Sequence, residues 1–342
     1  MTDQASPVLA LTMGEPAGIG GEITLKAWTR RAHLDPFFAI DDPERLRELA
    51  RRIGLEIPIQ AIGAPSEAAQ AFTQALPVLP LDRVVPMPAP VVTGRPDAAN
   101  AKAVIASIEA AVRLVLDGEA AAVVTNPIHK QVLYEADFSH PGHTEFLASL
   151  AGIDTPPVMM LAADELKVVP VTVHQSLSEA IDSLDSGAIT QAGLITAAAL
   201  RQDFGIARPR LAVAGLNPHA GEGGAMGSEE TDIIAPAIEA LCESGIDAFG
   251  PIAPDALFTA KARQGYDAAI CMYHDQALIP IKTIAFERAV NVTLGLPFVR
   301  TSPDHGTALD IAGTGAADES SLLAALKLAA DMSRNRTTAQ AA

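Results

Sequence analysis

The sequence predicts an α/β protein of parallel strands joined by crossover helices, arranged as two domains or one large unit. Three observations lead to this prediction. Short apolar runs typical of strands alternate along the chain with Ala- and Leu-rich stretches typical of helices. Hydrophobic residues make up 49% of the chain and aromatic residues only 4%, so Ala, Val, Leu and Ile must build the core. The length, 342 residues, exceeds that of a typical single domain.

The predicted strands are short, and most are followed by a loop and a helical stretch. We expect them within residues 8–13, 121–127, 166–174, 210–219 and 267–274. The clearest predicted helix covers residues 101–116, where apolar side chains recur at three- and four-residue spacing before the stop signal DGE. The Pro-rich segment 76–96 predicts extended surface chain or an irregular strand, and the tail 333–342 is expected to fray.

The charge balance excludes several classes of partner. Lys and Arg number 24 against 41 Asp and Glu, a net charge of −17, which repels nucleic-acid backbones and anionic membranes. Cys242 and Cys271 have neither metal-type spacing nor the density of a disulfide scaffold, so we expect a reducing, cytoplasmic setting. Residues 1–16 contain no basic leader and no long apolar segment, which argues against a signal peptide or a transmembrane helix.

Three predicted strands each deliver a histidine at the carboxyl end, namely His174, His219 and His274. Ligands bind at this edge of open α/β sheets. Neutral imidazole is the commonest metal ligand, and three of them leave coordination positions open for a substrate. A single histidine in such a place is more often structural or merely exposed, but three equivalent positions favour a metal site. Asp275 is a candidate to orient the neighbouring ligand or to accept a proton.

Two glycine-rich segments allow more than one interpretation. The loop 220–230 contains four glycines and could wrap a polar site or serve as an ordinary connector. The segment 12–22 invites a dinucleotide-binding interpretation, but Ile23 stands where the third glycine of G-x-G-x-x-G is required. A tight turn entering a helix is therefore the interpretation we adopt, and no Rossmann site is predicted.

Basic residues concentrate near the last predicted strands in spite of the acidic composition. Lys282 and Arg300, with Asn291 between them, could bind a substrate phosphate or carboxylate through charge-assisted hydrogen bonds. The alternative is a solvated face that balances nearby acidic residues. His143 and Thr144, in a Pro/Gly turn, form a second candidate for binding an oxyanion.

Six motifs occur together between about residue 8 and about residue 330: TMGEPAGIGGE, TNPIHK, GHTEFLA, LNPHAGEGGAMGSEE, MYHDQALIPIK and NVTLGLPFVRTSPDHGTALDIAGTGAAD. Together they resemble the 4-hydroxythreonine-4-phosphate dehydrogenase family of pyridoxal phosphate (vitamin B6) biosynthesis. The resemblance implies oxidation of the C3 hydroxyl of 4-phosphooxy-L-threonine by NAD, or by NADP, assisted by a divalent zinc, cobalt or magnesium ion. The resulting β-keto acid then loses CO₂ to give 3-amino-2-oxopropyl phosphate.

The resemblance also implies roles for individual residues. The metal ligands would be His174, His219 and His274. The substrate contacts would be His143, Thr144, Lys282, Asn291 and Arg300. Family members are homodimers with the active site at the subunit interface. The segment 304–315 is similar to the adenosine-binding part of isocitrate and isopropylmalate dehydrogenases, which puts the cofactor against His305, Gly306, Thr307 and Ala308.

The implied architecture is two α/β/α domains separated by a cleft, as in isocitrate and isopropylmalate dehydrogenases. Residues 1–133 plus 294–342 would form the cofactor side, and residues 134–293 would carry the metal ligands and the dimer interface. Two short departures from the family pattern lie beside the ligands, at Gln175–Leu177 and at Ala277. They leave open a sister dehydrogenase acting on 4-phospho-threonate, 4-phospho-erythronate or a cis-dihydrodiol. A non-catalytic metal- or phosphate-binding protein is the alternative from another class.

Overall fold

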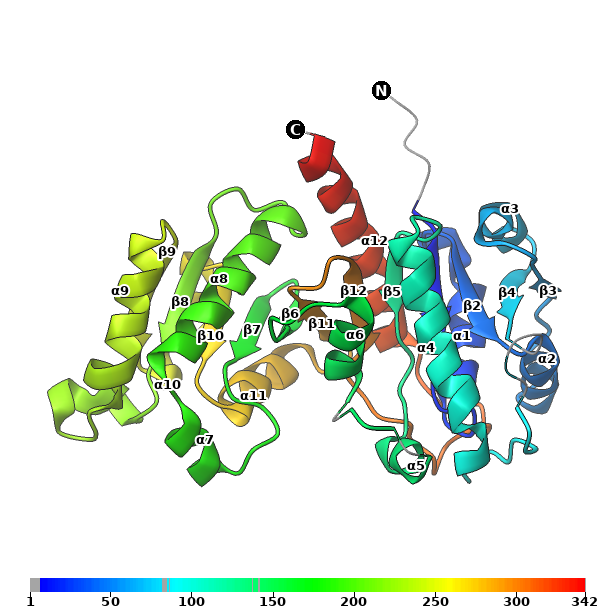
Figure 1. The fold of residues 1–342 in the computed structure, drawn as a ribbon, viewed down its shortest axis with the longest axis horizontal. Coiled ribbons are helices and arrows are strands. Elements are labelled where there is room, and N and C mark those ends of the chain that lie inside the picture. Colours follow the sequence, from blue (N-terminus) through cyan, green and yellow to red (C-terminus); the bar gives the residue numbers. More distant parts are fainter. Residues whose placement is uncertain (1–6, 82–84, 86, 137, 141, 342) are drawn as a thin grey trace. The chain divides into compact units, whose positions relative to one another are not determined.

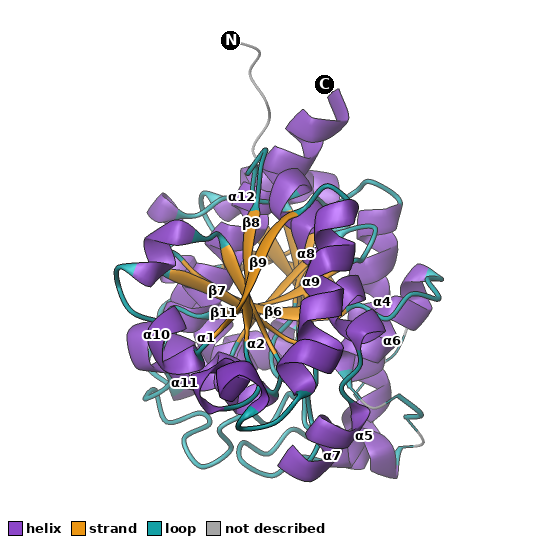
Figure 2. Cartoon of the chain, turned by 90° about the vertical axis from the view of Figure 1, so that its left-hand side faces the viewer, coloured by secondary structure: helices purple, strands orange, loops and turns teal. Residues whose placement is uncertain are grey.

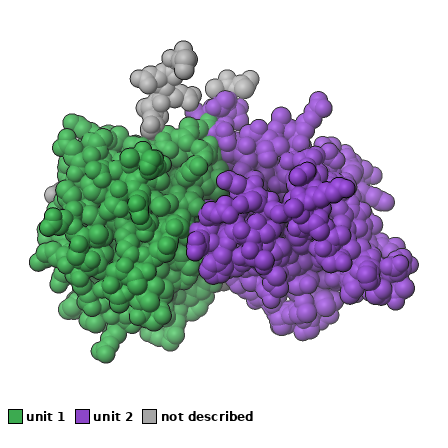
Figure 3. Space-filling model, turned by 180° about the vertical axis from the view of Figure 1, so that it is seen from behind, with its two compact units in different colours: residues 1–156, 296–334 green, residues 157–295, 335–342 purple. Residues whose placement is uncertain are grey.

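The computed structural model describes residues 7–81, 85, 87–136, 138–140 and 142–341, and Figure 1 traces the chain. The chain divides into two units, coloured separately in Figure 3. Unit 1 comprises residues 1–156 and 296–334, and unit 2 comprises residues 157–295 and 335–342. The expected first crossing after residue 133 therefore falls inside unit 1, and the chain passes to unit 2 only after residue 156.

Unit 1 is built on a parallel sheet with the strand order β3-β4-β2-β1-β5-β12. The strands are β1 (Leu9–Thr12), β2 (Phe37–Asp41), β3 (Ile59–Ala61), β4 (Leu76–Pro80), β5 (Ala122–Val124) and β12 (Val299–Pro303). Leu9 is in register with both Phe37 and Ala122, and Ala122 with Val299, so these parallel strands begin at one level and end within about two residues of one another. The loops that follow β1, β5 and β12 consequently leave the sheet at the same edge.

The helices of unit 1 cover the two faces of its sheet. They are α1 (Gly20–Thr29), α2 (Pro43–Arg52), α3 (Ala68–Phe72), α4 (Ala101–Leu116), α5 (Lys130–Glu135), α6 (His143–Ala151) and α12 (Ser320–Ala341), whose residues from Asn335 belong to unit 2. Helix α4 has the bounds that its periodicity predicted, and its Val104 and Ile108 pack in one core with Phe38 and Val123 of the sheet. The Thr301 hydroxyl donates to Ala325 O of α12. Because side chains alternate along a strand, α12 covers the face opposite α4.

Unit 2 has a mixed sheet with the strand order β11-β6-β7-β10-β8-β9. Its strands are β6 (Val158–Ala163), β7 (Leu166–Pro170), β8 (Arg210–Ala214), β9 (Asp247–Ile252), β10 (Ala268–Cys271) and β11 (Val290–Leu294). Strand β6 runs antiparallel to both β11 and β7, and the other pairs are parallel. The three strands predicted in this unit, β7, β8 and β10, are parallel as expected. Strand β6 was not predicted, and it is antiparallel to β7 because only residues 164–165 join the two and so short a connection permits only an antiparallel pair.

Helices also cover both faces of the unit 2 sheet (Figure 2). They are α7 (Leu177–Ser183), α8 (Ser186–Gln202), α9 (Ala235–Glu243), α10 (Pro254–Leu257) and α11 (His274–Ala285). Alternate strand residues, among them Ala212 and Ala269, pack in one core with Ala277 and Ile281 of α11. Helix α8 contacts the same strands, and Figure 2 shows α8 and α9 on the side of the strands away from α11. Small side chains on both faces bring these helices close to the sheet.

Two expected irregular segments are regular in the structure. Strand β4 pairs with both β2 and β3, and its Leu76 and Val78 are completely buried, so the start of the Pro-rich segment is an interior strand. Residues 82–84 and 86 of that segment lie outside the described residues. The expected frayed tail is instead helical to Ala341, because Arg336 donates to both carboxylate oxygens of the buried Asp203. Within the described ranges, every helix is too short or too polar to span a lipid bilayer.

Candidate active site

Two of the three predicted metal-binding histidines lie together in unit 2. His174 is in the loop after β7, and His274 is the first residue of α11, directly after β10. Strands β7 and β10 are parallel neighbours, so the two loops leave the sheet side by side, and the imidazole centroids are 6.3 Å apart. Two imidazoles on one tetrahedral ion have centroids about 5 Å apart. The pair therefore fits a divalent ion in chemistry and, after a small movement, in spacing.

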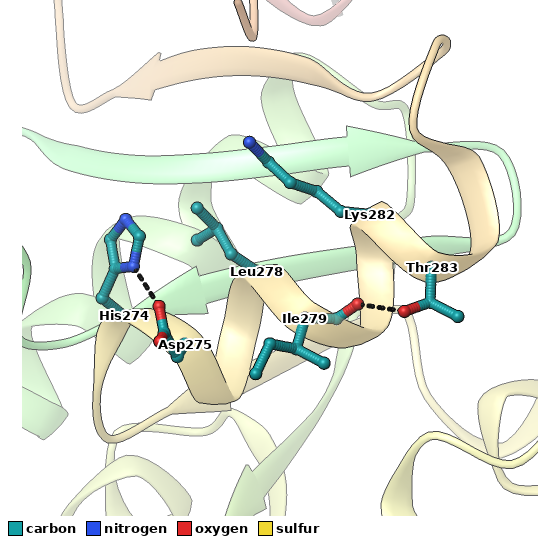
Figure 4. A pocket seen from close by; sticks show the side chains of 6 residues that line it. All are labelled: His274, Asp275, Leu278, Ile279, Lys282 and Thr283. Atoms are coloured by element: carbon teal, nitrogen blue, oxygen red, sulfur yellow. Dashed lines mark hydrogen bonds and ion pairs between the residues drawn. The ribbon is translucent and has the colours of Figure 1, made fainter.

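Asp275 fixes the orientation of the His274 ring. Its Oδ1 is 2.8 Å from Nδ1 of His274, and Figure 4 shows the other ring nitrogen pointing away from this carboxylate. A carboxylate on one ring nitrogen selects the tautomer whose other nitrogen can bind a metal. The geometry fits the orienting role that the sequence suggested for Asp275.

His219 has a different setting from the other two histidines. It is exposed, and it belongs to a short segment after β8 in which five consecutive residues, 219–223, have left-handed backbone angles. His219, Ala220 and Glu222 have φ values of 53°, 51° and 43°. Each such non-glycine residue costs roughly 1–2 kcal/mol, and strain of this kind clusters at functional sites.

Within one chain His219 does not complete a metal site. Among the residues that the structure describes, no group of three or more His, Cys, Asp or Glu side chains lies close enough together to hold a metal ion. In the described part of a single chain, His174 and His274 therefore have no third such side chain close enough to share a metal ion with them.

Lys282 lies on the same side of α11 as His274. His274, Leu278 and Lys282 follow at four-residue intervals and line a depression of about 440 Å³, drawn in Figure 4. Eight residues correspond to about 12 Å along a helix axis. A small extended substrate held at His274 could therefore reach the Lys282 ammonium group. Asn291, also predicted to contact the substrate, is half-buried in β11 opposite Leu161 of β6.

The other predicted substrate residues belong to unit 1. His143 and Thr144 begin α6, and Arg300 lies in β12, where its guanidinium Nη2 donates to the Thr125 hydroxyl at 2.6 Å. Arg300 is only 3% exposed. Burial lowers the pKa of Arg300 to about 10, so the side chain still carries its charge at neutral pH.

The imidazole of His143 is neutral at physiological pH. Burial is the largest cause of a pKa well below its ordinary value, and the charges of Arg300 and Lys130 lower that pKa further. Nε2 of His143 is withdrawn from solvent and has no hydrogen-bond partner among the described residues. Lys130 was not singled out from the sequence, yet a Cβ on Gly142 would be 3.3 Å from its Nζ. His143, Arg300 and Lys130 thus form a basic cluster suited to an anion.

The predicted cofactor segment forms the loop after β12 and meets the N-terminal glycine loop. Thr307 O accepts from Ile19 N at 3.0 Å, and a Cβ on Gly18 would be 2.9 Å from the same oxygen. His305 Nδ1 is 3.0 Å from Gly306 O, and Ala308 has a φ of 40°. The segment 12–22 fails the dinucleotide fingerprint, but it packs directly against the residues predicted to bind the cofactor.

Glu15, in the same glycine loop, was not predicted. Glu15 is 2% exposed, and burial raises its pKa in spite of a hydrogen bond from Ala17 N and the nearby charge of Arg45. An acid with a raised pKa beside a candidate ligand loop is the kind of group that functional sites collect. Glu15 lies between Gly14 and Pro16 in the sequence, where nothing marks it as buried.

Comparisons with known proteins agree with this architecture. Residues 33–329 match the family described as pyridoxal phosphate biosynthetic protein PdxA. The chain is 54% identical to the 4-hydroxythreonine-4-phosphate dehydrogenase of Bradyrhizobium diazoefficiens, over 98% of this chain and 100% of that protein. It is similar to the crystal structure of the Klebsiella pneumoniae enzyme of the same name, with a TM-score of 0.87 and 38% identity, covering 96% of this chain and 100% of that one.

A more distant likeness bears on the choice of substrate. The terephthalate 1,2-cis-dihydrodiol dehydrogenase of Burkholderia xenovorans has a TM-score of 0.64 and 29% identity, covering 95% of this chain and 98% of that one. The same fold thus occurs in a dehydrogenase whose name gives a different substrate, and the substrate must be argued from the side chains of the site.

Proposed function

Because the chain belongs to the pyridoxal phosphate biosynthetic PdxA family, we propose that it is a 4-hydroxythreonine-4-phosphate dehydrogenase. It oxidises the C3 hydroxyl of 4-phosphooxy-L-threonine with NAD, or with NADP, and the β-keto acid product loses CO₂ to give 3-amino-2-oxopropyl phosphate. The observation that carries the proposal is 54% identity to an enzyme of this name along 98% of the chain. The pairing of His174 with His274 supports the metal-dependent part of the proposal.

The residues of unit 2 have distinct proposed roles. His174 and His274 hold a divalent ion, and Asp275 keeps the His274 ring in the metal-binding tautomer. When bound, a divalent ion lowers the pKa of a substrate hydroxyl and stabilises negative charge on the oxygen before and after decarboxylation. Lys282, on the same side of α11, binds an anionic group of the substrate and thereby positions the carbon to be oxidised.

The residues of unit 1 are proposed to recognise the phosphorylated end of the substrate and the cofactor. Arg300 supplies a permanent charge, and the neutral His143 supplies a hydrogen bond without a further charge. The segment 305–308 and the glycine loop beside it bind the cofactor, which accepts the hydride when present. Three basic or imidazole groups in one cluster favour an anionic substrate, and a phosphate or a carboxylate would satisfy them equally.

The active enzyme is proposed to be a homodimer that shares the metal site. The single chain leaves His174 and His274 without a third ligand group, and a second copy would supply it through His219. Ile279, on α11, and Phe286, the residue directly after it, are 64% and 74% exposed, which supports α11 as part of an interface. Cys242 and Cys271 are free thiols, which supports a cytoplasmic setting.

The proposal is tested by the initial rate of NAD⁺ reduction with a divalent ion present. The protein should turn over 4-phosphooxy-L-threonine faster than 4-phospho-threonate, whereas faster turnover of the threonate would identify it as the sister dehydrogenase. No turnover of either substrate would favour a non-catalytic binding protein. His274→Ala should abolish metal retention, measured by elemental analysis after gel filtration, while His33→Ala, which removes an exposed histidine, should not.

A further inference from the structure

A chain of buried hydrogen bonds links the three strand ends that carry His174, His219 and His274. Its hub is Met272, the residue after β10, which is 1% exposed. Met272 O accepts from both the backbone N–H and the hydroxyl of Thr172, at 3.3 Å and 2.8 Å. Thr172 precedes His174 by two residues, and Met272 precedes His274 by two residues, so this part of the chain fixes the two histidine loops to each other.

Gln276 extends the chain to the third strand end. Its Oε1 accepts from Met272 N at 2.6 Å, and its Nε2 donates to Gly215 O, just after β8, at 2.7 Å. The side chain is 5% exposed, so both bonds are shielded from water. The single amide therefore joins the end of β10 to the end of β8, which leads to His219.

Glu230 completes the chain on the His219 side. It lies in a π-helical turn (Glu230–Ile234), is 5% exposed, and its Oε1 accepts from Leu216 N and Asn217 N at 2.8 Å and 2.7 Å. Its Oε2 accepts from Asn217 Nδ2 at 3.0 Å. Asn217 precedes His219 by two residues, at the same interval found for the other two histidines.

The close packing around Glu230 accounts for the left-handed segment beyond it. A Cβ on Gly221 would be 2.6 Å from Glu230 Oε2, so only glycine fits at this position. His219, two residues earlier, has a φ of 53°. Strained backbone persists only where its surroundings determine it fully. The buried carboxylate and the three N–H groups around it are those surroundings.

We propose that Gln276 and Glu230 are positioning residues, which hold the three histidine-bearing strand ends of unit 2 in fixed register. This proposal shares one assumption with the proposed function, namely that these three histidines are the metal ligands. The ordinary alternative is that both side chains merely satisfy buried backbone groups, as buried polar side chains commonly do. The two interpretations differ in what happens at His219 when a bond at Gln276 is removed.

The first test measures hydrogen exchange in the metal-free, full-length protein by mass spectrometry. Gln276→Met removes both bonds at similar length, whereas Gln276→Glu keeps an oxygen that accepts from Met272 and sets a carboxylate oxygen, when ionised, against Gly215 O in place of the donor. Gln276→Met should speed exchange at least about tenfold in both segments 215–219 and 272–274. Gln276→Glu should speed hydrogen exchange in segment 215–219 alone. If the Gln276→Met variant fails to fold, the Gln276→Glu variant alone decides whether Gln276 holds the end of β8.

Tyr266→Phe is the matched control, because it removes one buried hydrogen bond, to Leu257 O, elsewhere in the same unit. It should leave exchange unchanged in both segments. If the Gln276 variants also leave the exchange of 215–219 unchanged, the inference is overturned. This measurement needs neither metal nor substrate, so its result does not depend on whether the proposed function is right.

The second test measures Co²⁺ affinity by competition with a chromogenic chelator. Loss of a group that orients metal ligands typically weakens affinity about 10- to 100-fold, and we expect that loss in Gln276→Met and Glu230→Ala but not in Tyr266→Phe. Unchanged affinity together with faster exchange would refute a positioning role. If the unaltered protein binds no Co²⁺, the proposed metal-dependent function fails, and the exchange measurement alone decides whether the strand ends are held as inferred.

Discussion

Replacing His143 by Gln should make unit 1 less sensitive to mild acid than it is in the unaltered protein. In the native state burial and the charges of Arg300 and Lys130 hold the pKa of His143 well below its ordinary value. Protonation in place would put a further positive charge beside the buried Arg300 and close to Lys130. The unfolded chain has no such restriction, because there the imidazole is in water with a pKa of about 6.5.

The sign and the size of the effect follow from proton linkage. Below pH 6.5 the His143 side chain is protonated in the unfolded state but not in the native state. The free energy of unfolding therefore decreases as the pH falls through that value. Above pH 6.5 both states are neutral and the difference vanishes. If native His143 stays neutral at pH 5.5, it alone lowers the free energy of unfolding by about 1.4 kcal/mol relative to pH 7.5, which is RT ln 10.

Trp28 provides a fluorescence probe for the unfolding of unit 1, which contains His143. It is the only tryptophan of the chain, lies in α1 of unit 1 and is 4% exposed, with its indole N–H donating to Phe72 O at 3.0 Å. Urea unfolding followed by tryptophan fluorescence at pH 7.5 and pH 5.5 gives the acid-induced loss of stability for each variant. His143→Gln should lose about 1.4 kcal/mol less than the unaltered protein over this interval.

The comparison cancels the contributions of the other histidines, which are present in both proteins. His33→Gln removes an exposed histidine of the same unit and serves as the control. Its free energy of unfolding should decrease between pH 7.5 and pH 5.5 by as much as that of the unaltered protein. An equal loss in His143→Gln and in the unaltered protein would mean that His143 protonates freely in the native state. That result would also remove the argument that it acts as an uncharged hydrogen-bonding group.

Three further changes should have specific effects. Asp203→Ala leaves the largely buried guanidinium of Arg336 without its carboxylate and should lower the free energy of unfolding by about 3–5 kcal/mol in urea denaturation; a loss below about 1 kcal/mol would contradict this. Glu22→Ala removes a fully buried carboxylate that accepts from two backbone N–H groups and should cost at least about 3 kcal/mol by the same measurement, with Trp28 fluorescence as the signal. Gly18→Ala forces a methyl group to within 2.9 Å of Thr307 O. We expect the KM for NAD to rise about tenfold with little change in kcat. An unchanged KM would mean that this loop takes no part in binding the cofactor.

Local patterns predicted the elements whose signals are local. Helix α4 begins and ends where the apolar repeat and the following DGE place it. The antiparallel strand β6 was missed because its direction depends on the two-residue turn that follows it, and strand periodicity carries no information on direction. The tail was expected to fray because no sequence pattern reveals that Arg336 meets Asp203, 133 positions earlier.

The residues of the candidate site also fall into those that the sequence predicted and those that only the packing of the chain reveals. The histidines at 174 and 274 could be expected to meet, since strand ends in an α/β sheet converge at one edge and both segments read as strands. Lys130 was overlooked, because its proximity to His143 depends on how α5 and α6 pack in unit 1 and not on any motif. The glycine loop was set aside on the fingerprint test, and its connection to the candidate cofactor segment became visible only in the structure, through the hydrogen bond from Ile19 to Thr307.

Gln276 and Glu230 show why such residues escape a sequence analysis. Gln276 follows a candidate ligand by two positions and would ordinarily be interpreted as an exposed residue at a helix start, yet it is buried and bonded to Gly215, 61 positions earlier. Glu230 follows a glycine loop and would be interpreted as surface charge, yet its carboxylate is enclosed by backbone N–H groups. Candidate ligand residues can be proposed from their chemistry, because three histidines at equivalent strand ends favour a metal site more than any one of them does. Residues that position them use the same amide and carboxylate groups as any polar surface, and only their burial and their partners distinguish them.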